Sequence, residues 1–382
     1  MTERELNKRV EQILKSYDDV NRLFIRKIAE NIKKIGHLNA SSINRISIMA
    51  SMNADINEIT QAIAKAADLS TKDLRALYEQ ALNDTYTDKR FQRALSREPL
   101  APADRRRLEW YTQAATVQTA GVLRNLSNTT IVSKVYQDAI DTAILAVVTG
   151  GMDYKSATRD VLRNLGMNGL QVEYPSGYHR RADSAIRQNI TNGAKQIAQD
   201  ASLMMGEALG YDAVEISAHA MSAPDHEPIQ GRVFLLSEFE KMQSEQPFQD
   251  IDGHHFEPIK RAIGEWNCMH VVSAFSTEFS KRAYTDKQLK DWAEDNARGC
   301  EYGDKHYTTY QASQRMRLIE TKVRHLKDTA IGAKEADDPE LRRECQRKIS
   351  ALMADYNAFA TAAELRPHPD RMYVPGYRTV KS

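Results

Sequence analysis

Apolar residues recur every three or four positions from Leu6 to Ile35, a spacing that strongly limits the structures this segment can form. The positions are Val10, Ile13, Tyr17, Val20, Phe24, Ile28, Ile32 and Ile35. They fall on one face of an α-helix, and Gly36 follows where a helix C-terminus favours a residue that tolerates positive φ. The segment predicts one long amphipathic helix. Such a face more often forms the core of a helical bundle than a docking surface for a partner.

The rest of residues 1–165 carries further helix signals and few strand signals. Ser41, Ser70 and Pro102 each stand where a helix would begin, ahead of runs with apolar positions at helical spacing. Two more helices are expected, over 130–148 and at 154–165. We therefore predict an N-terminal α-helical bundle that occupies residues 1–165.

From Gly166 onward the pattern is mixed. GLQVEYPSGY predicts a small hairpin, a long helix follows to about Leu209, and DAVEISAHA predicts a strand that ends near Ser217. Residues 235–263 resemble an insertion loop that contains one short amphipathic helix, SEFEKM. The segment 166–285 is thus expected to form a small α+β domain.

Residues 286–382 predict a C-terminal helical hairpin and an extended tail. One helix is expected from Lys305 to Ala330, and Asp338-Pro339 opens a second. The basic, proline-rich end, RPHPDRMYVPGYRTVKS, suits a tail that becomes ordered only on a neighbouring subunit. The predicted fold class is therefore mainly α with a small α+β module.

The charge balance excludes a strong overall attraction to nucleic acid or to an anionic membrane. The 382 residues include 53 basic and 52 acidic side chains, so any contact with DNA would be local. The first C-terminal helix is rich in basic residues, which could form a DNA-binding face or an ordinary solvated one. These are Arg315, Arg317, Lys322, Arg324 and Lys327.

Cysteine use favours a reducing assembly compartment, and the distribution of apolar residues argues against secretion and a membrane span. The three cysteines, Cys268, Cys300 and Cys345, are widely spaced and odd in number, which is not typical of a disulfide framework. The N-terminus lacks an apolar signal core, and no apolar run is long enough to span a bilayer. We expect neither secretion nor an integral membrane protein.

Chemically reactive side chains gather in an irregular region of the central domain. His219, His226, Cys268 and His270 could hold a structural zinc ion, with His254 or His255 as other possible ligands. The alternative is that the histidines hydrogen-bond loop backbone and Cys268 is a small buried apolar residue. The spacing leaves both interpretations open.

Three catalytic interpretations lack a complete set of residues. DGHHF with Asn267 and His270 resembles a metal-dependent HNH nuclease, but these two residues lie too close in sequence for that motif. Cys268 with a nearby histidine could suggest a cysteine protease, although sequence proximity does not establish the required geometry. The Glu-x-Glu of SEFEK, which ADP-ribosyltransferases also carry, is interpreted as surface charge. No catalytic residue is assigned.

The patterns SAH, PxHxxxQGxxF and WNCxH resemble the signature of the phage minor capsid protein 2 family, which is related to the Mu-F-like minor head proteins. Gln230, Gly231, Trp266 and Asn267 carry the signature together with the histidines and Cys268. The resemblance covers about half of the chain, mainly its central and C-terminal parts.

This resemblance implies a non-enzymatic virion component in the capsid interior near the portal, present in the host cytoplasm during assembly. It implies contacts with the portal, major capsid or scaffolding protein, and with packaged DNA through local basic patches. The implied role is in head assembly, DNA packaging or genome delivery. The competing interpretation is a virion-carried enzyme, such as a metal-dependent nuclease or a toxin-like effector.

Overall fold

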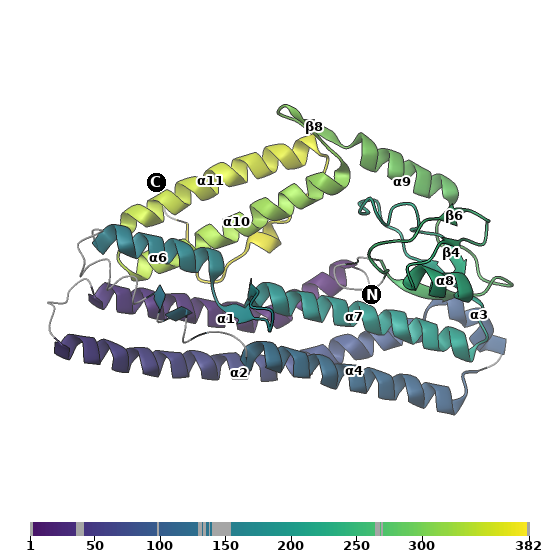
Figure 1. The fold of residues 1–382 in the computed structure, drawn as a ribbon, viewed down its shortest axis with the longest axis horizontal. Coiled ribbons are helices and arrows are strands. Elements are labelled where there is room, and N and C mark those ends of the chain that lie inside the picture. Colours follow the sequence, from purple (N-terminus) through teal and green to yellow (C-terminus); the bar gives the residue numbers. More distant parts are fainter. Residues whose placement is uncertain are drawn as a thin grey trace. The chain divides into compact units, whose positions relative to one another are not determined.

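A computed structural model describes most of the chain. The described residues are 3–35, 42–97, 99–128, 154–263 and 270–379, with Val132, Val135, Tyr136, Asp138, Ala139 and Cys268. Most of the helix predicted over 130–148 lies outside this part. Helices dominate the described residues, which confirms the predicted fold class of a mainly α protein with a small α+β module (Figure 1).

The chain forms two compact units, each assembled from three separated stretches. The first contains Met1–Val10, Thr71–Ala120 and Gln188–Ser313; the second contains Glu11–Ser70, Gly121–Arg187 and Gln314–Ser382. The boundaries between the units pass through several helices. Because spatial grouping does not show which segments fold independently, the division into three sequence domains stays a prediction.

Long helices build the second unit. α1 (Glu3–Ile35) confirms the predicted first helix, and its Phe24, Ile28 and Ile32 are fully buried. The predictions of separate helices after Ser41 and Ser70 are wrong, because one continuous helix, α2 (Ser42–Tyr86), covers both. Ser70 donates its hydroxyl to the Ala66 carbonyl one turn earlier, at 2.7 Å, and so stays within the helix without capping one.

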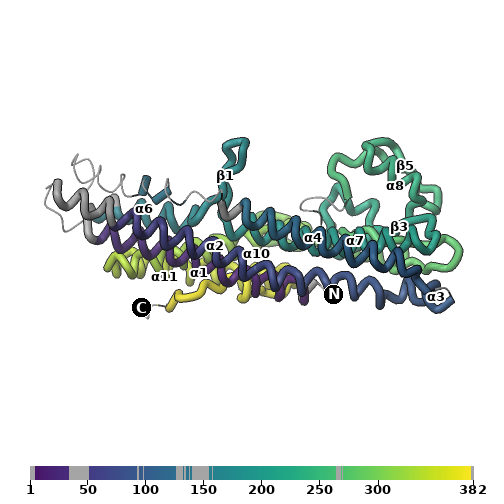
Figure 2. Tube along the Cα trace, turned by 90° about the horizontal axis from the view of Figure 1, so that it is seen from below, coloured from purple at the N-terminus to yellow at the C-terminus, as the bar shows by residue number. Residues whose placement is uncertain are grey.

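A small β-hairpin also belongs to this unit. It lies between α6 (Tyr154–Asn168) and α7 (Ala182–Ala208), and consists of β1 (Gln171–Glu173) paired antiparallel with β2 (His179–Arg181). Figure 2 shows the hairpin projecting away from the helices. The hairpin predicted from GLQVEYPSGY is confirmed.

The C-terminal helices also belong largely to the second unit. α10 (Thr309–Glu335) and α11 (Pro339–Ala362) confirm the predicted helical pair, and the Asp338 side chain caps α11. The tail includes a 3₁₀ turn, η1 (Pro369–Met372), where Met372 is 2% exposed and its carbonyl accepts a hydrogen bond from Lys327. The expectation that the tail orders only on a neighbouring subunit is therefore wrong, because its own chain orders it.

The first unit contains the α+β module, beside α3 (Lys89–Arg97) and α4 (Pro102–Asn128). Its sheet has the order β4-β3-β7 and is antiparallel throughout, with β3 (Ala213–Ile216) between β4 (Val233–Leu235) and β7 (Val272–Phe275). All four residues of β3 are buried. The strand predicted from DAVEISAHA is thus the centre of the sheet.

The predicted insertion loop forms part of the module's core. It contains the expected short helix, α8 (Leu236–Gln243), followed by a pair of strands, β5 (Phe248–Gln249) and β6 (His255–Phe256). Met242, Phe248 and Ile263 pack in the same buried cluster as β3 and β7. A loop is too simple a description, because apolar side chains anchor this segment.

Residues 286–308 also differ from expectation. α9 (Asp286–Arg298) is followed by the strands β8 (Cys300–Tyr302) and β9 (Lys305–Tyr307), and α10 begins only at Thr309. Gly303 adopts φ 61° in the turn between the strands, a conformation that glycine accommodates without a Cβ clash. The helix predicted from Lys305 therefore starts later.

Within the described residues, no helix combines the length and the apolarity needed to cross a membrane.

Candidate functional site

The end of β3 and the start of β7 bring the signature histidines and Cys268 together. Ile216 pairs with Val272 at this edge of the sheet. The Ser217 backbone N–H donates to the Val271 carbonyl at 2.9 Å, and the Val271 N–H donates to the Ser217 hydroxyl at 2.8 Å. The segment after β3 and the segment before β7 are therefore fixed side by side, which explains the Ser of the SAH motif.

Cys268, His226 and His270 form one buried cluster. Cys268 Sγ lies 3.6 Å from Nδ1 of His226 and 3.6 Å from Nδ1 of His270. The three ligand atoms all lie within 4.8 Å of one another. His226 is 1% exposed, His270 3% and Cys268 4%, so the cluster is closed to solvent.

The outer nitrogen of each imidazole contacts an oxygen. His226 Nε2 lies 2.8 Å from the Arg261 carbonyl, and His270 Nε2 lies 3.3 Å from Gln230 Oε1. A carbonyl oxygen can only accept, so His226 Nε2 donates its proton to Arg261. His270 Nε2 lies near two oxygens, Gln230 Oε1 and the Ser222 hydroxyl at 3.4 Å, and can donate to either. In the neutral rings with the proton on Nε2, each Nδ1 directs its lone pair toward the Cys268 sulfur.

The electrostatic environment differs between the two histidines. Burial, together with the nearby His219 and His226, lowers the pKa of His270 to about 3. Burial also lowers the pKa of His226, but hydrogen bonds with Cys268 and the Arg261 carbonyl raise it above its usual value. His270 is therefore a neutral imidazole at physiological pH.

His219 lies beside this cluster and is not one of its three converging side chains. Its ring stacks on His270, with the ring centroids 4.7 Å apart. Its backbone N–H donates to Gln230 Oε1 at 3.0 Å. The structure thus brings together three of the four predicted ligands and places the fourth against one of them.

The Gln-Gly pair of the signature has a structural explanation. Gln230 is 3% exposed and links His219 to His270 through one oxygen. Gly231 adopts φ 68°, and a Cβ at this position would lie 2.5 Å from Leu289 Cδ2. Glycine is required both by the backbone conformation and by this close approach. Trp266 and Asn267, the other signature residues, lie outside the described part of the chain.

Comparison with known proteins agrees with this signature. The family profile described as phage minor capsid protein 2 matches residues 1–360. The chain belongs to the phage minor capsid protein 2 family. The match extends well beyond the half of the chain that the motifs covered. No curated protein and no solved structure shows a significant match.

Family membership makes this minor capsid protein a structural component of the virion that interacts with other virion proteins. The match includes the helical unit as well as the α+β module. The residues of the buried cluster lie within the matched range.

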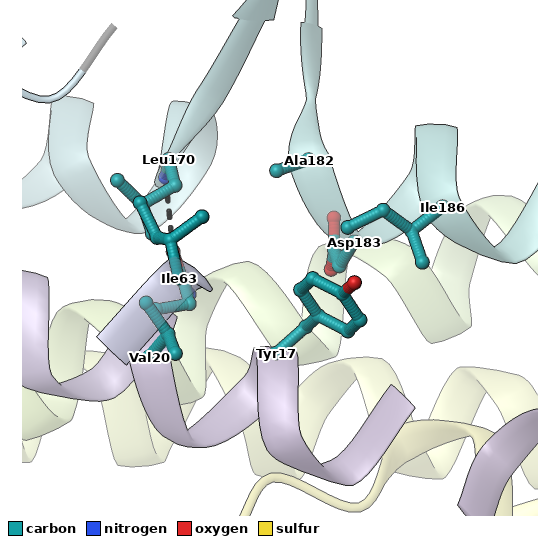
Figure 3. A pocket seen from close by; sticks show the side chains of 8 residues that line it. Tyr17, Val20, Ile63, Leu170, Ala182, Asp183 and Ile186 are labelled. Carbon is teal, nitrogen blue, oxygen red and sulfur yellow. Dashed lines mark hydrogen bonds between the residues drawn. The ribbon is translucent and has the colours of Figure 1, made fainter. Parts of the chain in front are cut away.

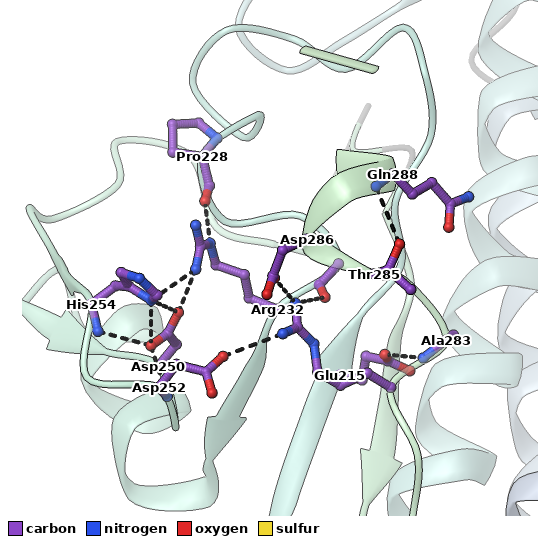
Figure 4. A network of polar contacts seen from close by, with 12 residues as sticks. Glu215, Pro228, Arg232, Asp250, Asp252, His254, Ala283, Thr285, Asp286 and Gln288 are labelled. Carbon is purple, nitrogen blue, oxygen red and sulfur yellow. Dashed lines mark hydrogen bonds and ion pairs between the residues drawn. The ribbon is translucent and has the colours of Figure 1, made fainter. Parts of the chain in front are cut away.

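A second polar group in the capsid protein's module organises the β5–β6 turn. Asp250 accepts hydrogen bonds from the backbone N–H groups of Asp252 and His254 and pairs with Arg232 at 2.6 Å (Figure 4). His254 Nδ1 lies 2.9 Å from the same carboxylate. The oxygens of Asp250 are thus already used, which favours a structural role over metal binding. His254 and His255 are not part of the Cys268 cluster.

The Glu-x-Glu pair of α8 differs in part from the expected surface charge. Glu238 is 7% exposed, pairs with Lys241 at 2.6 Å, and accepts the Gln249 backbone N–H at 2.9 Å. Glu240 is exposed, as expected. The description as surface charge is wrong for Glu238, because its carboxylate holds β5 against α8.

The second unit contains a buried charge network that local sequence patterns did not reveal. Arg181 pairs with Asp183 at 3.2 Å and with Asp328 at 3.0 Å, and Arg324 also pairs with Asp183. Burial raises the pKa of Asp183, but Arg181 and Arg324 hold it well below its usual range. Burial raises the pKa of Asp328, although Arg181 and Arg324 both act to lower it.

A small pocket adjoins this network. Tyr17, Val20, Ile63, Leu170 and Ile186 contribute most of its walls, and Asp183 lies at its edge (Figure 3). The Asp183 oxygens already bond Arg181, Arg324 and the Ser184 N–H. The pocket is therefore best explained as an imperfectly filled part of the core.

Several basic residues of α10 serve the fold. Arg315 pairs with Asp355 and stacks on the Phe359 ring, Arg324 pairs with Asp183, and Lys327 donates to the Met372 carbonyl. Arg317 and Lys322 are exposed. The five residues do not form one continuous phosphate-binding face, because three of them have partners within the chain.

Proposed function

We propose that this protein is a non-enzymatic minor head protein that lies in the capsid interior near the portal, and in the host cytoplasm during assembly. It would contact the portal, major capsid or scaffolding protein and assist head assembly, DNA packaging or genome delivery. The observation that carries this proposal is the family match over residues 1–360, which includes parts of both compact units. If the chain carried a fused effector domain, the segment that forms this domain would be expected to lie outside the family match.

The burial of Cys268 supports a structural role over the enzyme alternative. A cysteine nucleophile must meet its substrate, yet the side chains of Cys268, His226 and His270 are almost fully enclosed. Each outer imidazole nitrogen also bonds an oxygen of the chain itself. This arrangement favours rigidity over turnover.

A surface suited to contacts with another virion protein lies on α4. Trp110 is 68% exposed and Val117 is 72% exposed. They are seven residues apart and therefore share one helix face, with Ala114 between them. Exposed tryptophan is uncommon on a free surface and is enriched where proteins bind one another. We propose that this face binds a neighbouring virion protein, which for a protein near the portal would be the portal itself.

The arginines of α4 give little support to DNA binding by this helix, because two of them pair with glutamates. Arg105 pairs with Glu109 at 3.2 Å, and Arg107 pairs with Glu207 at 3.0 Å. A DNA contact through α10 would depend on the exposed Arg317 and Lys322, and would weaken steeply with salt.

Co-purification with the phage's own portal protein tests the proposal. The wild-type chain is expected to bind the portal, and a Trp110→Ala, Val117→Ser variant is expected to bind at least about tenfold more weakly. Leu69→Ser is the matched control, because Leu69 is 57% exposed on α2 and lies on a different helix. Failure of the wild-type chain to bind the portal or to enter purified heads would contradict the proposal.

Heads assembled with Cys268→Ala distinguish a structural protein from an enzyme. The structural role predicts altered thermal stability of the protein without loss of a catalytic activity in the head. Wild-type protein that cleaves DNA or protein, with activity lost in Cys268→Ala at unchanged stability, would support the enzyme alternative.

A further inference from the structure

The Cys268 sulfur lies between two imidazole nitrogens, Nδ1 of His226 and Nδ1 of His270. Both Nδ1 atoms lie 3.6 Å from this sulfur, while His226 Nε2 lies 2.8 Å from the Arg261 carbonyl and His270 Nε2 lies 3.3 Å from Gln230 Oε1. We propose that Cys268, His226 and His270 bind one zinc ion, which joins the β3–β4 connection to the segment that enters β7. This inference is independent of the partner proposed for the virion.

The separations between ligand atoms match the requirements of the ion. Zinc–sulfur bonds of about 2.3 Å and zinc–nitrogen bonds of about 2.05 Å, at a tetrahedral angle, place sulfur and nitrogen about 3.6 Å apart. The two observed separations are both 3.6 Å. Both sulfur–nitrogen separations are therefore those of ligands that share one ion, and all three ligand atoms lie within 4.8 Å of one another.

A cation can satisfy all three ligand atoms at once. The Cys268 thiolate and the Nδ1 lone pairs of His226 and His270 would all point to one ion. Gln230 Oε1, which accepts the His219 backbone N–H, can also accept a proton from His270 Nε2 and so leave Nδ1 of that ring for the ion. The Ser222 hydroxyl lies 3.4 Å from the same Nε2 and can also accept that proton.

The ligand types identify the class of metal. One thiolate and two imidazoles are typical of zinc and poorly suited to calcium or magnesium, which prefer oxygen ligands. Hydrogen bonds from the outer histidine nitrogens to a carbonyl and to Gln230 are the arrangement that orients metal-bound imidazoles. His219, which stacks on His270, can supply a fourth ligand after a rotation of its side chain.

The position of the site explains what the ion would do. His226 lies in the irregular connection between β3 and β4, whereas Cys268 and His270 lie just before β7. The three-stranded sheet is small, with strands of three or four residues. An ion held from both sides would fix the connections where the sheet itself offers few backbone hydrogen bonds.

Metal analysis of the full chain tests the site. Protein expressed with added zinc and dialysed against metal-free buffer is expected to retain about one zinc ion per chain. Cys268→Ser and His226→Ala are expected to lose most of it, while Cys300→Ser retains it. Cys300 is the matched control, because it is also a buried cysteine of the first unit and lies outside the described metal-ligand clusters.

Cobalt spectroscopy tests the site on the wild-type chain, and its result therefore does not depend on whether the variants fold. Chelator-treated wild-type protein reconstituted with Co²⁺ is expected to show a thiolate-to-cobalt charge-transfer band and intense visible bands of tetrahedral cobalt. Removal of the ion is expected to lower the melting temperature by about 10 °C. Added zinc should restore it.

Two results would overturn the zinc site. One is a folded wild-type chain that holds no zinc and shows no thiolate band with cobalt. The other is a Cys268→Ser chain that keeps the full zinc content. Neither result depends on portal binding, so failure of this inference is distinguishable from failure of the proposed virion role.

Discussion

Arg181 and Asp328 form an ion pair in which Nη2 and Oδ2 are 3.0 Å apart and the carboxylate is buried. They are separated by 147 positions in the sequence. Asp183 pairs with the same guanidinium at 3.2 Å and also with Arg324, so Arg181 links two buried acids. The pair connects β2 with α10 inside the second unit.

Arg181→Met should therefore destabilise the protein strongly. Loss of the guanidinium leaves the buried Asp328 carboxylate uncompensated, which costs about 3–5 kcal/mol of the free energy of unfolding. Urea unfolding monitored by circular dichroism measures this change. Arg317→Met, which changes an exposed arginine of α10, is the control and should cost under about 1 kcal/mol. If Asp328→Asn in the Arg181→Met background restores none of the stability, the pair is not the cause.

Sequence reasoning recovered the elements whose signal is local. The apolar spacing of α1 and the Pro-Ser-Gly turn of the β1–β2 hairpin were both confirmed, because helix and turn geometry depend on neighbouring residues. Ser70 shows the limit of such signals. A serine ahead of a helical pattern predicts a cap, but the same hydroxyl can bond the preceding turn of a longer helix.

The parts that could not be predicted depend on distant residues. Nothing in the neighbourhood of Arg181 indicates that Asp328 will lie beside it. At the candidate site, the residue types predicted a Cys-His cluster, but only the structure shows that Gln230 and the Arg261 carbonyl select the nitrogen facing Cys268. The same geometry places His219 against His270, outside the three converging ligands.

Asp18 should make the stability of the second unit depend on pH. Burial, with the adjacent Asp183 charge, raises its pKa from 3.8 to about 7. The folded chain therefore keeps a proton that the unfolded chain releases between pH 4 and 7, and the free energy of unfolding falls as pH rises through this window. Above pH 7 the loss is complete and amounts to at most about 4 kcal/mol.

Asp18→Asn removes this ionisation and should remove its contribution to the pH dependence. The variant is expected to be more stable than wild type at pH 8 and similar to it near pH 4. Urea unfolding of both chains at a series of pH values gives the difference, in which the contributions of other groups cancel. Parallel stability curves for the two chains would show that Asp18 does not titrate in this window.

Gly231→Ala should cost more stability than an equivalent change at Gly253. Both glycines have positive φ, 68° and 83°, so alanine introduces backbone strain of about 1–2 kcal/mol at either position. At Gly231 the new Cβ would also lie 2.5 Å from Leu289 Cδ2, whereas nothing lies within 4 Å at Gly253. The clash should add about 1–3 kcal/mol.

Thermal and urea unfolding of the two variants measures this difference. Leu289→Ala combined with Gly231→Ala should recover part of the additional loss, because it removes the side chain that the new Cβ meets. Equal stability of the Gly231 and Gly253 variants would show that Leu289 moves away at no cost.

Gln230→Ala should weaken zinc binding if the proposed site is correct. Gln230 Oε1 receives the His270 Nε2 proton at 3.3 Å and the His219 N–H at 3.0 Å, so its loss frees the His270 ring to rotate and to change tautomer. Loss of such an outer partner lowers metal affinity by about 10–100-fold. Competition with a chromophoric chelator measures the affinity.

Gln230→Glu is the informative companion, because it keeps an oxygen acceptor at the same place. It should retain an affinity closer to that of wild type than Gln230→Ala does. His254→Ala removes a histidine of the same unit that contacts Asp250 and not Cys268, and should leave the zinc affinity unchanged. A Gln230→Ala variant that binds zinc as tightly as wild type would show that Gln230 does not orient His270. The role of Gln230 would then be confined to the Gln-Gly turn.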